Sequence, residues 1–240
     1  MVTFTIDGQQ VQGEEGAMIL DVAKANDIYI PSLCAHEGVS PYGACRLCLV
    51  EVTKNTRKRL VASCLYPIEK GLVVTTNSDR IANNRKVLME LLWARCPDSE
   101  IIQDLAKRLG VEKTTFPLED HDKCILCALC VRACEEIVGT SAISLVNRGV
   151  RREMSIPFYD NSEACIGCGS CAYICPTDAI TTKDVDDTRI ISMPNTKIEF
   201  KLKKCKTCNS YWAPEKQLEY IACITQQSPD IFNSCPQCRD

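Results

Sequence analysis

The sequence predicts an α+β protein that is divided into several small modules, and three observations support this fold class. Of the 240 residues, 18 are cysteines, and most of them fall into regularly spaced sets. Apolar residues alternate in strand fashion near the N-terminus, whereas they recur at helical spacing between residues 78 and 109. Without its cysteines the chain is only about 37% hydrophobic, which is little for one large continuous core.

The first module, residues 1–77, is predicted to combine short strands with one short helix. Residues 1–12 alternate between apolar and polar side chains around a turn at Asp7-Gly8, which favours a β-hairpin. Further elements are expected as follows: a helix over 17–25, and strands over 47–53 and 71–75. The module contains four cysteines, which are Cys34, Cys45, Cys48 and Cys64.

Residues 78–122 are predicted to form a helical connector. Apolar residues recur at helical spacing from Ile81 to Leu92, and Pro97 then interrupts the pattern. A second helix is expected after this proline, with Gly110 as its C-terminal cap.

A third module, residues 123–182, contains an internal repeat. Two stretches share the spacing C-x2-C-x2-C-x3-C. The first copy consists of Cys124, Cys127, Cys130 and Cys134, and the second consists of Cys165, Cys168, Cys171 and Cys175. A charged linker is expected after the repeat, around residues 183–189.

The repeated spacing is typical of cysteines that bind 4Fe-4S clusters. Such a cluster needs four thiolates around a cube of iron and sulfide, and C-x2-C-x2-C supplies three of them from one tight loop. In two-cluster ferredoxins the fourth cysteine of each run binds the other cluster. We therefore assign one cube to Cys124, Cys127, Cys130 and Cys175, and the other to Cys165, Cys168, Cys171 and Cys134. A pair of zinc sites is the alternative, but zinc ligands usually come as two separated pairs.

The cysteines of the first module follow the spacing C-x10-C-x2-C-x15-C. Four thiolates suit a 2Fe-2S cluster, and the small residues Gly43 and Ala44 allow backbone N–H groups to approach a cluster sulfide. Spacing alone leaves a zinc site open, because the plant-type run is C-x4-C-x2-C and this loop is longer.

Three stretches surround these cysteines: Ile30-Pro31-Ser32-Leu33-Cys34, Gly43-Ala44-Cys45-Arg46-Leu47-Cys48-Leu49-Val50-Glu51-Val52 and Ala62-Ser63-Cys64. They resemble the 2Fe-2S domain that opens the large iron-sulfur subunit of respiratory complex I. The resemblance continues through both copies of the repeat and covers residues 1–182. Within this family, the sequence most resembles the short diaphorase iron-sulfur subunit of NAD-linked hydrogenases.

This resemblance implies a β-grasp 2Fe-2S ferredoxin domain over 1–77 and a bacterial-type two-cluster 4Fe-4S ferredoxin domain over 123–182. The implied cofactors are one 2Fe-2S cluster and two 4Fe-4S clusters. Usual members of the family carry a further cluster, held by one histidine and three cysteines, just after the 2Fe-2S domain. Residues 78–112 contain only Cys96 and no histidine, so that cluster cannot form there.

A fourth module, residues 198–240, contains two C-x2-C pairs separated by 26 residues. The first pair is Cys205 with Cys208, and the second is Cys235 with Cys238. This layout is typical of a zinc ribbon, and we favour one structural zinc over a third 4Fe-4S cluster held by the same four thiolates. The core predicted here is too thin to fold without metal and consists of Tyr211, Trp212, Leu218, Ile221 and Phe232.

Composition and motifs argue against several classes of function. A net charge of −3 with interspersed charges provides no basic stripe for nucleic acid. No apolar run approaches the roughly 20 residues needed to span a bilayer, so we expect no direct membrane insertion. The N-terminus lacks the features of a secretion signal, which favours a reducing, cytoplasmic location. We expect no active site, because the sequence offers no dinucleotide loop, Walker motif or acid–base dyad.

The predicted function is electron transfer within a larger oxidoreductase. By resemblance, the partners are a flavin- and NAD(P)-binding, diaphorase-like subunit and a second redox subunit, such as a hydrogenase, a formate dehydrogenase or a flavin-bifurcating module. One alternative is a shortened relative of a catalytic iron hydrogenase. The chain ends at residue 240 without a long catalytic module, which argues against this alternative. The other is a zinc-dependent scaffold. Four residues belong to no spaced set and are expected to be ordinary structural residues: Cys96, Cys223, His36 and His121.

Overall fold

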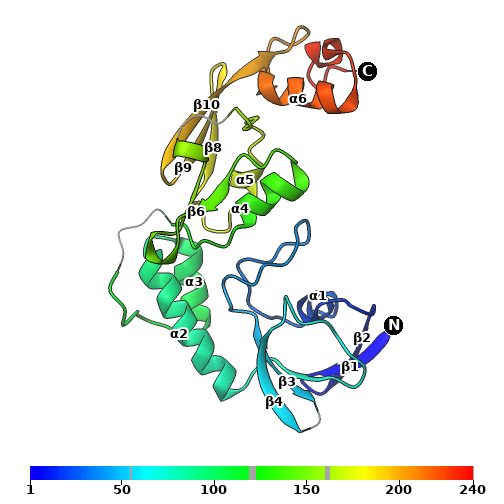
Figure 1. Ribbon diagram of the computed structural model, residues 1–240, viewed down its shortest axis with the longest axis vertical. Coiled ribbons are helices and arrows are strands. Elements are labelled where there is room, and N and C mark those ends of the chain that lie inside the picture. Colours follow the sequence, from blue (N-terminus) through cyan, green and yellow to red (C-terminus); the bar gives the residue numbers. More distant parts are fainter. Residues whose placement is uncertain (55, 119–122, 160–162, 240) are drawn as a thin grey trace. The chain divides into compact units, whose positions relative to one another are not determined.

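A computed structural model describes residues 1–54, 56–118, 123–159 and 163–239 (Figure 1). The chain folds into two compact units, Met1–Ala128 and Leu129–Asp240. Both units mix helices and strands, which confirms the predicted α+β content. Within the described ranges, no helix is both long enough and apolar enough to cross a membrane.

The first unit begins with five strands and one helix: β1 (Val2–Ile6), β2 (Gln9–Gly13), α1 (Ile19–Ala25), β3 (Leu49–Lys54), β4 (Arg57–Ala62) and β5 (Val73–Thr75). The strands form one mixed sheet with the order β2-β1-β5-β3-β4. Strand β1 pairs with β2 in antiparallel and with β5 in parallel orientation, whereas β3 pairs antiparallel with both β4 and β5.

The structure confirms the hairpin, the helix and the two further strands expected in the first module. The core between the sheet and α1 includes Phe4, Ile6, Leu20 and Val74, all of them buried. The sequence pattern missed β4, because its first three residues, Arg57–Arg59, are exposed and charged. Charged side chains are a common protection of an edge strand, and they conceal the alternation that identifies a strand.

Two helices follow the sheet, α2 (Asp79–Arg95) and α3 (Glu100–Arg108), and they pack against each other. Ser78 caps α2, since its hydroxyl oxygen accepts a hydrogen bond from the N–H of Ile81 at 3.3 Å. The break between the helices contains Pro97, and Gly110 follows α3 with a φ of +70°. Both helices of the predicted connector are therefore confirmed.

Arg85 of α2 ties this helix to the sheet. Its guanidinium donates hydrogen bonds to the carbonyl oxygens of Leu47 at 3.0 Å and Leu49 at 2.7 Å, which flank Cys48. The side chain is buried, and burial lowers the pKa of Arg85. One charged donor thus satisfies two backbone acceptors on either side of a predicted ligand.

We expect Arg85→Ala to lower the free energy of unfolding by about 2–4 kcal/mol, because two backbone acceptors lose their charged donor. Denaturant unfolding of the full chain, followed by circular dichroism, measures this loss. The control is Arg80→Ala. The exposed Arg80 pairs with Glu51 at 3.5 Å, and its removal should cost less than about 1 kcal/mol. Equal losses in the two variants would contradict a special role for Arg85.

The second unit begins with two short helices, α4 (Leu129–Arg132) and α5 (Ser170–Tyr173), which pack against each other. Cys130 lies in α4 and Cys171 in α5, so the repeat in the sequence is also a repeat in the structure. The segment between the helices contains η1 (Ala133–Ile137), β6 (Ser144–Val146), η2 (Gly149–Arg151), β7 (Glu153–Ser155) and η3 (Pro157–Tyr159). Strands β6 and β7 form an antiparallel hairpin.

A four-stranded antiparallel sheet follows the repeat. It consists of β8 (Thr181–Val185), β9 (Thr188–Met193), β10 (Thr196–Lys204) and β11 (Tyr211–Pro214), in the order β11-β10-β9-β8. The prediction of a charged linker around 183–189 was wrong, because these residues form β8, which is exposed throughout, its turn into β9 and the start of β9. Along β10, alternate residues Ile198, Phe200 and Leu202 are buried.

The C-terminal part contains α6 (Glu215–Thr225) and the short helix η4 (Pro229–Asn233). Its core confirms Leu218 and Phe232, which are buried, and Trp212 and Ile221, which pack against them. Tyr211, the fifth predicted core residue, is instead 42% exposed, so its prediction was wrong. Its ring lies beside the ammonium group of Lys204, 5.9 Å from the ring centre.

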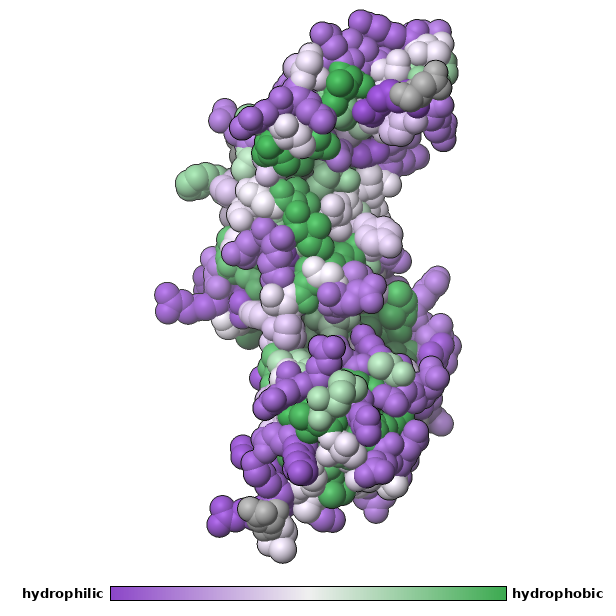
Figure 2. Space-filling model, turned by 90° about the vertical axis from the view of Figure 1, so that its right-hand side faces the viewer, coloured by the Kyte–Doolittle hydropathy of each residue, from purple (hydrophilic) through white to green (hydrophobic). Residues whose placement is uncertain are grey.

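Hydrophilic side chains cover most of the face drawn in Figure 2, with smaller hydrophobic groups between them. Charged residues make up 25% of the chain. Buried apolar residues gather in separate small cores, such as those of the N-terminal sheet and of α6. Division into small cores is what the low apolar content predicts.

Candidate metal centres

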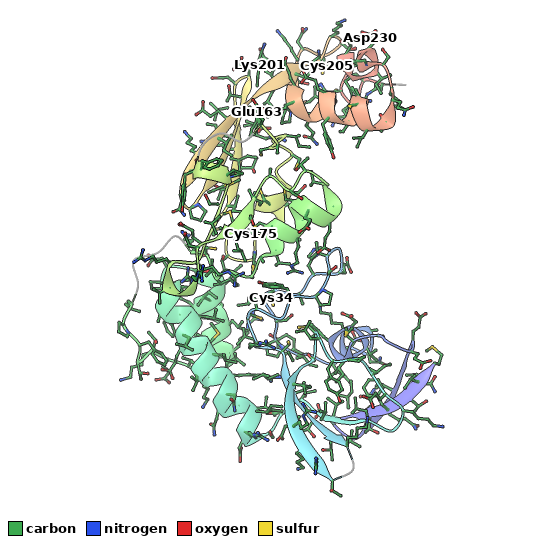
Figure 3. The ribbon with its side chains drawn as sticks, in the orientation of Figure 1. Cys34, Glu163, Cys175, Lys201, Cys205 and Asp230 are labelled. Carbon is green, nitrogen blue, oxygen red and sulfur yellow. The ribbon has the colours of Figure 1, made fainter. Side chains whose placement is uncertain are left out.

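The four cysteines of the first module lie together at one end of β3 and β4. Cys34, Cys45, Cys48 and Cys64 are all buried, with exposed fractions of at most 7%. The N–H of Cys45 lies 3.4 Å from Cys34 Sγ, and the N–H of Leu33 lies 3.5 Å from Cys45 Sγ. Cys48 Sγ and Cys64 Sγ are 3.4 Å apart. Figure 3 labels Cys34 in the long loop that precedes β3.

Hydrogen bonds between these thiols shift their pKa values. The hydrogen bond with Cys64 lowers the pKa of Cys48 to about 6, whereas the same bond, together with burial, raises the pKa of Cys64. The hydrogen bond with Cys34, together with burial, raises the pKa of Cys45. A bound cation removes this competition, because each thiolate then faces positive charge instead of another sulfur. Four buried, convergent thiols therefore fit a metal cluster.

The two copies of the repeat have the same unusual backbone. Leu126 and Ala128 in the first copy have φ values of +53° and +58°, and the equivalent Gly167 and Gly169 have +73° and +79°. Left-handed residues between right-handed ones turn successive N–H groups toward one point and create an anion-binding concavity. The first copy adopts this conformation without glycine, at a cost of roughly 1–2 kcal/mol per residue. Both loops are thus shaped to donate hydrogen bonds to a negatively charged group.

We expect Gly167→Ala to lower the free energy of unfolding by about 1–3 kcal/mol more than Gly169→Ala. Both glycines have left-handed backbone, but only at residue 167 would a Cβ atom overlap a neighbour, the Phe200 ring, at 2.6 Å. At residue 169 the nearest atom, in Thr182, is 3.4 Å away. Denaturant unfolding of the two variants makes the comparison. Equal losses would show that the Phe200 contact does not restrain the loop.

The second run of cysteines shares a cavity with a cysteine from the first run. Cys165, Cys168 and Cys171 line this cavity together with Cys134. Cys134 Sγ also accepts a hydrogen bond from the N–H of Ala142 at 3.2 Å. Much of the remaining lining is apolar and includes Val138, Ile143, Ile166, Ile191 and Met193.

Burial makes the thiolate form costly in this cavity. It raises the pKa of Cys171 to about 12 and also raises the pKa of Cys165, with the neighbouring sulfurs of Cys168 and Cys134 adding to both shifts. Buried thiolates need positive charge to compensate them, and iron in a cluster supplies it. The donor set and its apolar surroundings therefore fit a thiolate-bound cluster.

The remaining cysteines of the repeat are Cys124, Cys127, Cys130 and Cys175. Cys124 and Cys127 belong to the first unit, whereas Cys130 and Cys175 belong to the second. Within the first unit, Arg95 Nε donates a hydrogen bond to the carbonyl oxygen of Cys124 at 2.7 Å, which anchors the start of the first cysteine loop to α2. Cys130 is buried in α4, and Cys175 follows α5 and is half-buried.

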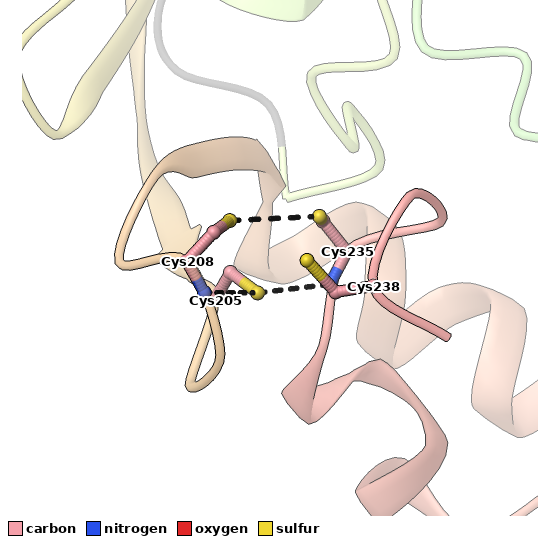
Figure 4. Close-up of side chains that lie close together, drawn as sticks. All are labelled: Cys205, Cys208, Cys235 and Cys238. Atoms are coloured by element: carbon pink, nitrogen blue, oxygen red, sulfur yellow. Dashed lines mark hydrogen bonds between the residues drawn. The ribbon is translucent and has the colours of Figure 1, made fainter. Parts of the chain in front are cut away.

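The four cysteines of the C-terminal module converge on one point (Figure 4). The sulfur atoms of Cys205, Cys208, Cys235 and Cys238 all lie within 4.8 Å of one another. Cys205 Sγ accepts hydrogen bonds from the N–H groups of Cys208 at 3.5 Å and Cys235 at 3.3 Å. These bonds lower the pKa of Cys205 to about 6. Cys205 follows β10 directly, as Figure 3 shows.

The spacing of these sulfur atoms fits one metal ion. A tetrahedral ion with metal–sulfur bonds of about 2.3 Å places its ligand sulfurs about 3.8 Å apart. Cys208 Sγ and Cys235 Sγ lie 3.8 Å apart. In a 4Fe-4S cube each thiolate binds a different iron atom, which holds the four ligand sulfurs farther apart than a single ion does.

Sequence reasoning missed the residues of the second sheet that cover the cavity of Cys134. Ile191 and Met193 of β9 line this cavity, and Phe200 of β10 packs against Gly167 in its cysteine loop. The alternation of apolar and charged residues along β10 was the signal that could have identified this cover.

The cysteines and histidines outside the spaced sets have separate places. Cys96 is buried at the C-terminal end of α2, and Cys223 is exposed on α6. Nδ1 of His36 accepts a hydrogen bond from the N–H of Gly38 at 3.1 Å, which is a local turn contact. His121 lies outside the described residues.

Two family models match the chain. A 2Fe-2S iron-sulfur cluster binding domain matches residues 1–79, and a 4Fe-4S dicluster domain matches residues 123–179. The chain therefore carries a 2Fe-2S cluster-binding domain and a 4Fe-4S dicluster domain, followed by the further four-cysteine site. Both expected cluster types, 4Fe-4S from the cysteine spacing and 2Fe-2S from the resemblance, are confirmed.

Three curated proteins are similar to this chain. The NADP-reducing hydrogenase subunit HndD of Solidesulfovibrio fructosivorans is 34% identical over 75% of this chain and 36% of its own length. The NADPH-Fe(3+) oxidoreductase subunit alpha of Geobacter sulfurreducens is 35% identical over 76% and 24%. The 78 kDa subunit of mitochondrial NADH-ubiquinone oxidoreductase of Neurospora crassa is 31% identical over 76% and 28%. The chain thus matches between 24% and 36% of the length of these relatives.

A solved structure is also similar. One chain of an NAD+-reducing [NiFe]-hydrogenase in the H2-reduced state has 32% sequence identity and a TM-score of 0.59, over 65% of this chain and 75% of that one. Together with the matched domains, this likeness confirms the resemblance expected from the cysteine motifs. The chain belongs to the family of iron-sulfur subunits found in NAD(P)-linked hydrogenases and in complex I.

Proposed function

We propose that the chain relays electrons between a flavin- and NAD(P)-linked subunit and a second redox subunit of a larger oxidoreductase. The observation that carries this proposal is the succession of a buried four-cysteine site at β3 and a two-cluster module within one chain. The proposed modules are 1–77 for the 2Fe-2S cluster, 78–122 as helical connector, 123–182 for two 4Fe-4S clusters and 198–240 for a metal ion.

In the first module, the proposed ligands bind in two pairs. A 2Fe-2S cluster has two iron atoms, and each takes two thiolates. Cys48 and Cys64 lie 3.4 Å apart and suit one iron, whereas Cys34 and Cys45, which share a hydrogen bond, suit the other. The backbone N–H groups at Leu33 and Cys45 donate toward these sulfurs and thereby stabilise their negative charge.

In the dicluster module, we propose that the fourth ligands cross between the two runs. The cavity shared by Cys134 with Cys165, Cys168 and Cys171 supports one cube. The remaining cysteines, Cys124, Cys127, Cys130 and Cys175, are the proposed ligands of the other cube. Iron in the clusters supplies one-electron chemistry, while the residues of this chain hold the thiolates, donate hydrogen bonds to them and exclude water from them.

For the C-terminal module we propose one zinc ion, bound by Cys205, Cys208, Cys235 and Cys238. The close spacing of the four sulfurs supports a single ion rather than a third 4Fe-4S cluster. Zinc has no redox chemistry, so this module is a structural part beside the electron path.

The proposed partners follow from the relatives. Several are named as subunits of NADP- or NADH-linked enzymes, and the solved relative is an NAD+-reducing hydrogenase. Nucleotide oxidation is therefore assigned to a diaphorase-like partner, and the second partner is a hydrogenase, a formate dehydrogenase or a bifurcating module. A cytoplasmic location is part of the proposal, because cysteines stay available as thiolate ligands in a reducing compartment.

Redox assays of the purified, cluster-loaded chain test this function. We expect dithionite to reduce its clusters, while the chain alone neither oxidises NADH nor evolves hydrogen. Added diaphorase-like partner should then allow NADH to reduce the same clusters. Turnover of NADH or hydrogen by the chain alone would contradict the proposal, as would clusters that dithionite cannot reduce.

A further inference from the structure

The sheet of the second unit connects the cavity of Cys134 to the C-terminal metal site. Ile191 and Met193 of β9 line the cavity. On the neighbouring strand, β10, Phe200 packs so closely against Gly167 that no Cβ atom fits there. Strand β10 then ends at Lys204, and the next residue is Cys205. Cys205, a predicted ligand of the C-terminal metal, is therefore five residues from Phe200, which contacts the cysteine loop of the second cube.

Helix α6 makes a second connection between the same two sites. Tyr220 Oη donates a hydrogen bond to the carbonyl oxygen of Val138 at 3.1 Å. The next residue, Gly139, has a φ of +79°, and a Cβ atom there would lie 3.3 Å from Tyr220 Oη. Val138 and Thr140 both line the cavity, and Thr140 Oγ1 lies 3.4 Å from Cys134 Sγ. Tyr220 thus holds the loop that follows one of the cluster ligands.

The position of α6 depends on the metal module. Leu218 and Ala222 of the helix form a core cluster with Ala213 and Phe232. Phe232 lies three residues before Cys235, and Ala213 lies five residues after Cys208. This cluster is small, and a metal that joins the two cysteine pairs would complete the fold around the helix.

We propose that the C-terminal metal module is a brace for one cluster: metal bound by Cys205, Cys208, Cys235 and Cys238 holds β10 and α6 against the loops of the second 4Fe-4S cube. The brace keeps solvent from that cube. It leaves the 2Fe-2S cluster unaffected. This inference rests on the proposed function in one respect: the second 4Fe-4S cube and the C-terminal metal must both be bound.

Iron release under anaerobic conditions tests the brace. The full chain, reduced with dithionite, is exposed to the ferrous chelator bathophenanthroline disulfonate, and iron loss is followed with time. In Cys238→Ser we expect about four of about ten iron atoms to leave at least tenfold faster than in the parent chain. In Tyr220→Phe the same fraction should leave about threefold faster, because one hydrogen bond is lost. The remaining iron should leave at the parental rate in both variants.

Two matched controls accompany these variants. Cys223→Ser changes an exposed cysteine on α6, and Tyr173→Phe changes a tyrosine that is 89% exposed beside the second cysteine run. Both should release iron at the parental rate. The brace is overturned if Tyr220→Phe behaves like Tyr173→Phe, or if Cys238→Ser accelerates the loss of all clusters equally.

The parent chain is analysed for metals first, which separates this inference from the proposed function. A parent without iron and sulfide refutes the proposed function. A parent with its clusters but without metal in the C-terminal module overturns the brace alone.

Discussion

Cys134→Ala is expected to destroy the 4Fe-4S cluster of Cys165, Cys168 and Cys171, although Cys134 belongs to the other cysteine run. The reason is geometric, because the structure places Cys134 in the cavity of the second run. About four of about ten iron atoms should be lost, or one cube should convert to a three-iron species. Electron paramagnetic resonance of the reduced variant, combined with iron analysis, measures the change.

The reciprocal variant is the control for this crossing. Cys175→Ala should damage the cube of Cys124, Cys127 and Cys130 and leave the second cube intact. Cys45→Ala should remove only the 2Fe-2S signal, since its site lies in another module. If Cys134→Ala instead abolishes the signal that depends on Cys124, each run binds its own cluster and the crossed assignment is wrong.

Cys235→Ser is expected to remove the zinc and to unfold the C-terminal module. The core cluster around α6 has four buried residues, whereas a structural zinc site contributes about 10–16 kcal/mol of apparent binding free energy to folding. Zinc should fall from about one per chain to near zero, and limited proteolysis should cleave within residues 205–240. The 2Fe-2S signal should remain.

The matched control is Cys223→Ser on the exposed face of α6, which should keep its zinc and resist the protease as the parent chain does. A Cys235→Ser variant that retains zinc would refute the proposed ligand set. Loss of iron and labile sulfide from the C-terminal site in place of zinc would identify a third cluster there.

Much of the first unit could be predicted from sequence because its signals are local. Alternation predicted β1 and β2, and helical spacing with Pro97 predicted α2 and α3. The spacing of the repeated cysteines predicted the 4Fe-4S clusters, because a cluster requires thiolates at short, regular separations on a loop. The resemblance of the sequence around Cys45 and Cys48 to known 2Fe-2S domains then distinguished iron–sulfur from zinc, which spacing alone left open.

The cover of the second cube could not be predicted in the same way. Strand β8 is exposed along its whole length and carries charges, so its pattern is that of a linker. The contact of Phe200 with Gly167 joins residues 33 positions apart, and that of Tyr220 with Val138 joins residues 82 positions apart. The alternation along β10 indicates a buried face, but which loop that face covers depends on tertiary packing. Tyr211 was misplaced for the same reason.

Metal and sulfide analysis of the anaerobically purified full chain tests the central claim most directly. One 2Fe-2S cluster, two 4Fe-4S clusters and one zinc ion predict about ten iron atoms, about ten labile sulfides and about one zinc per chain. About fourteen iron atoms and no zinc would show that a third 4Fe-4S cluster occupies the C-terminal site instead of zinc. Zinc in place of iron at all the cysteine sets, with no labile sulfide and no visible absorbance, would contradict an electron-transfer role altogether.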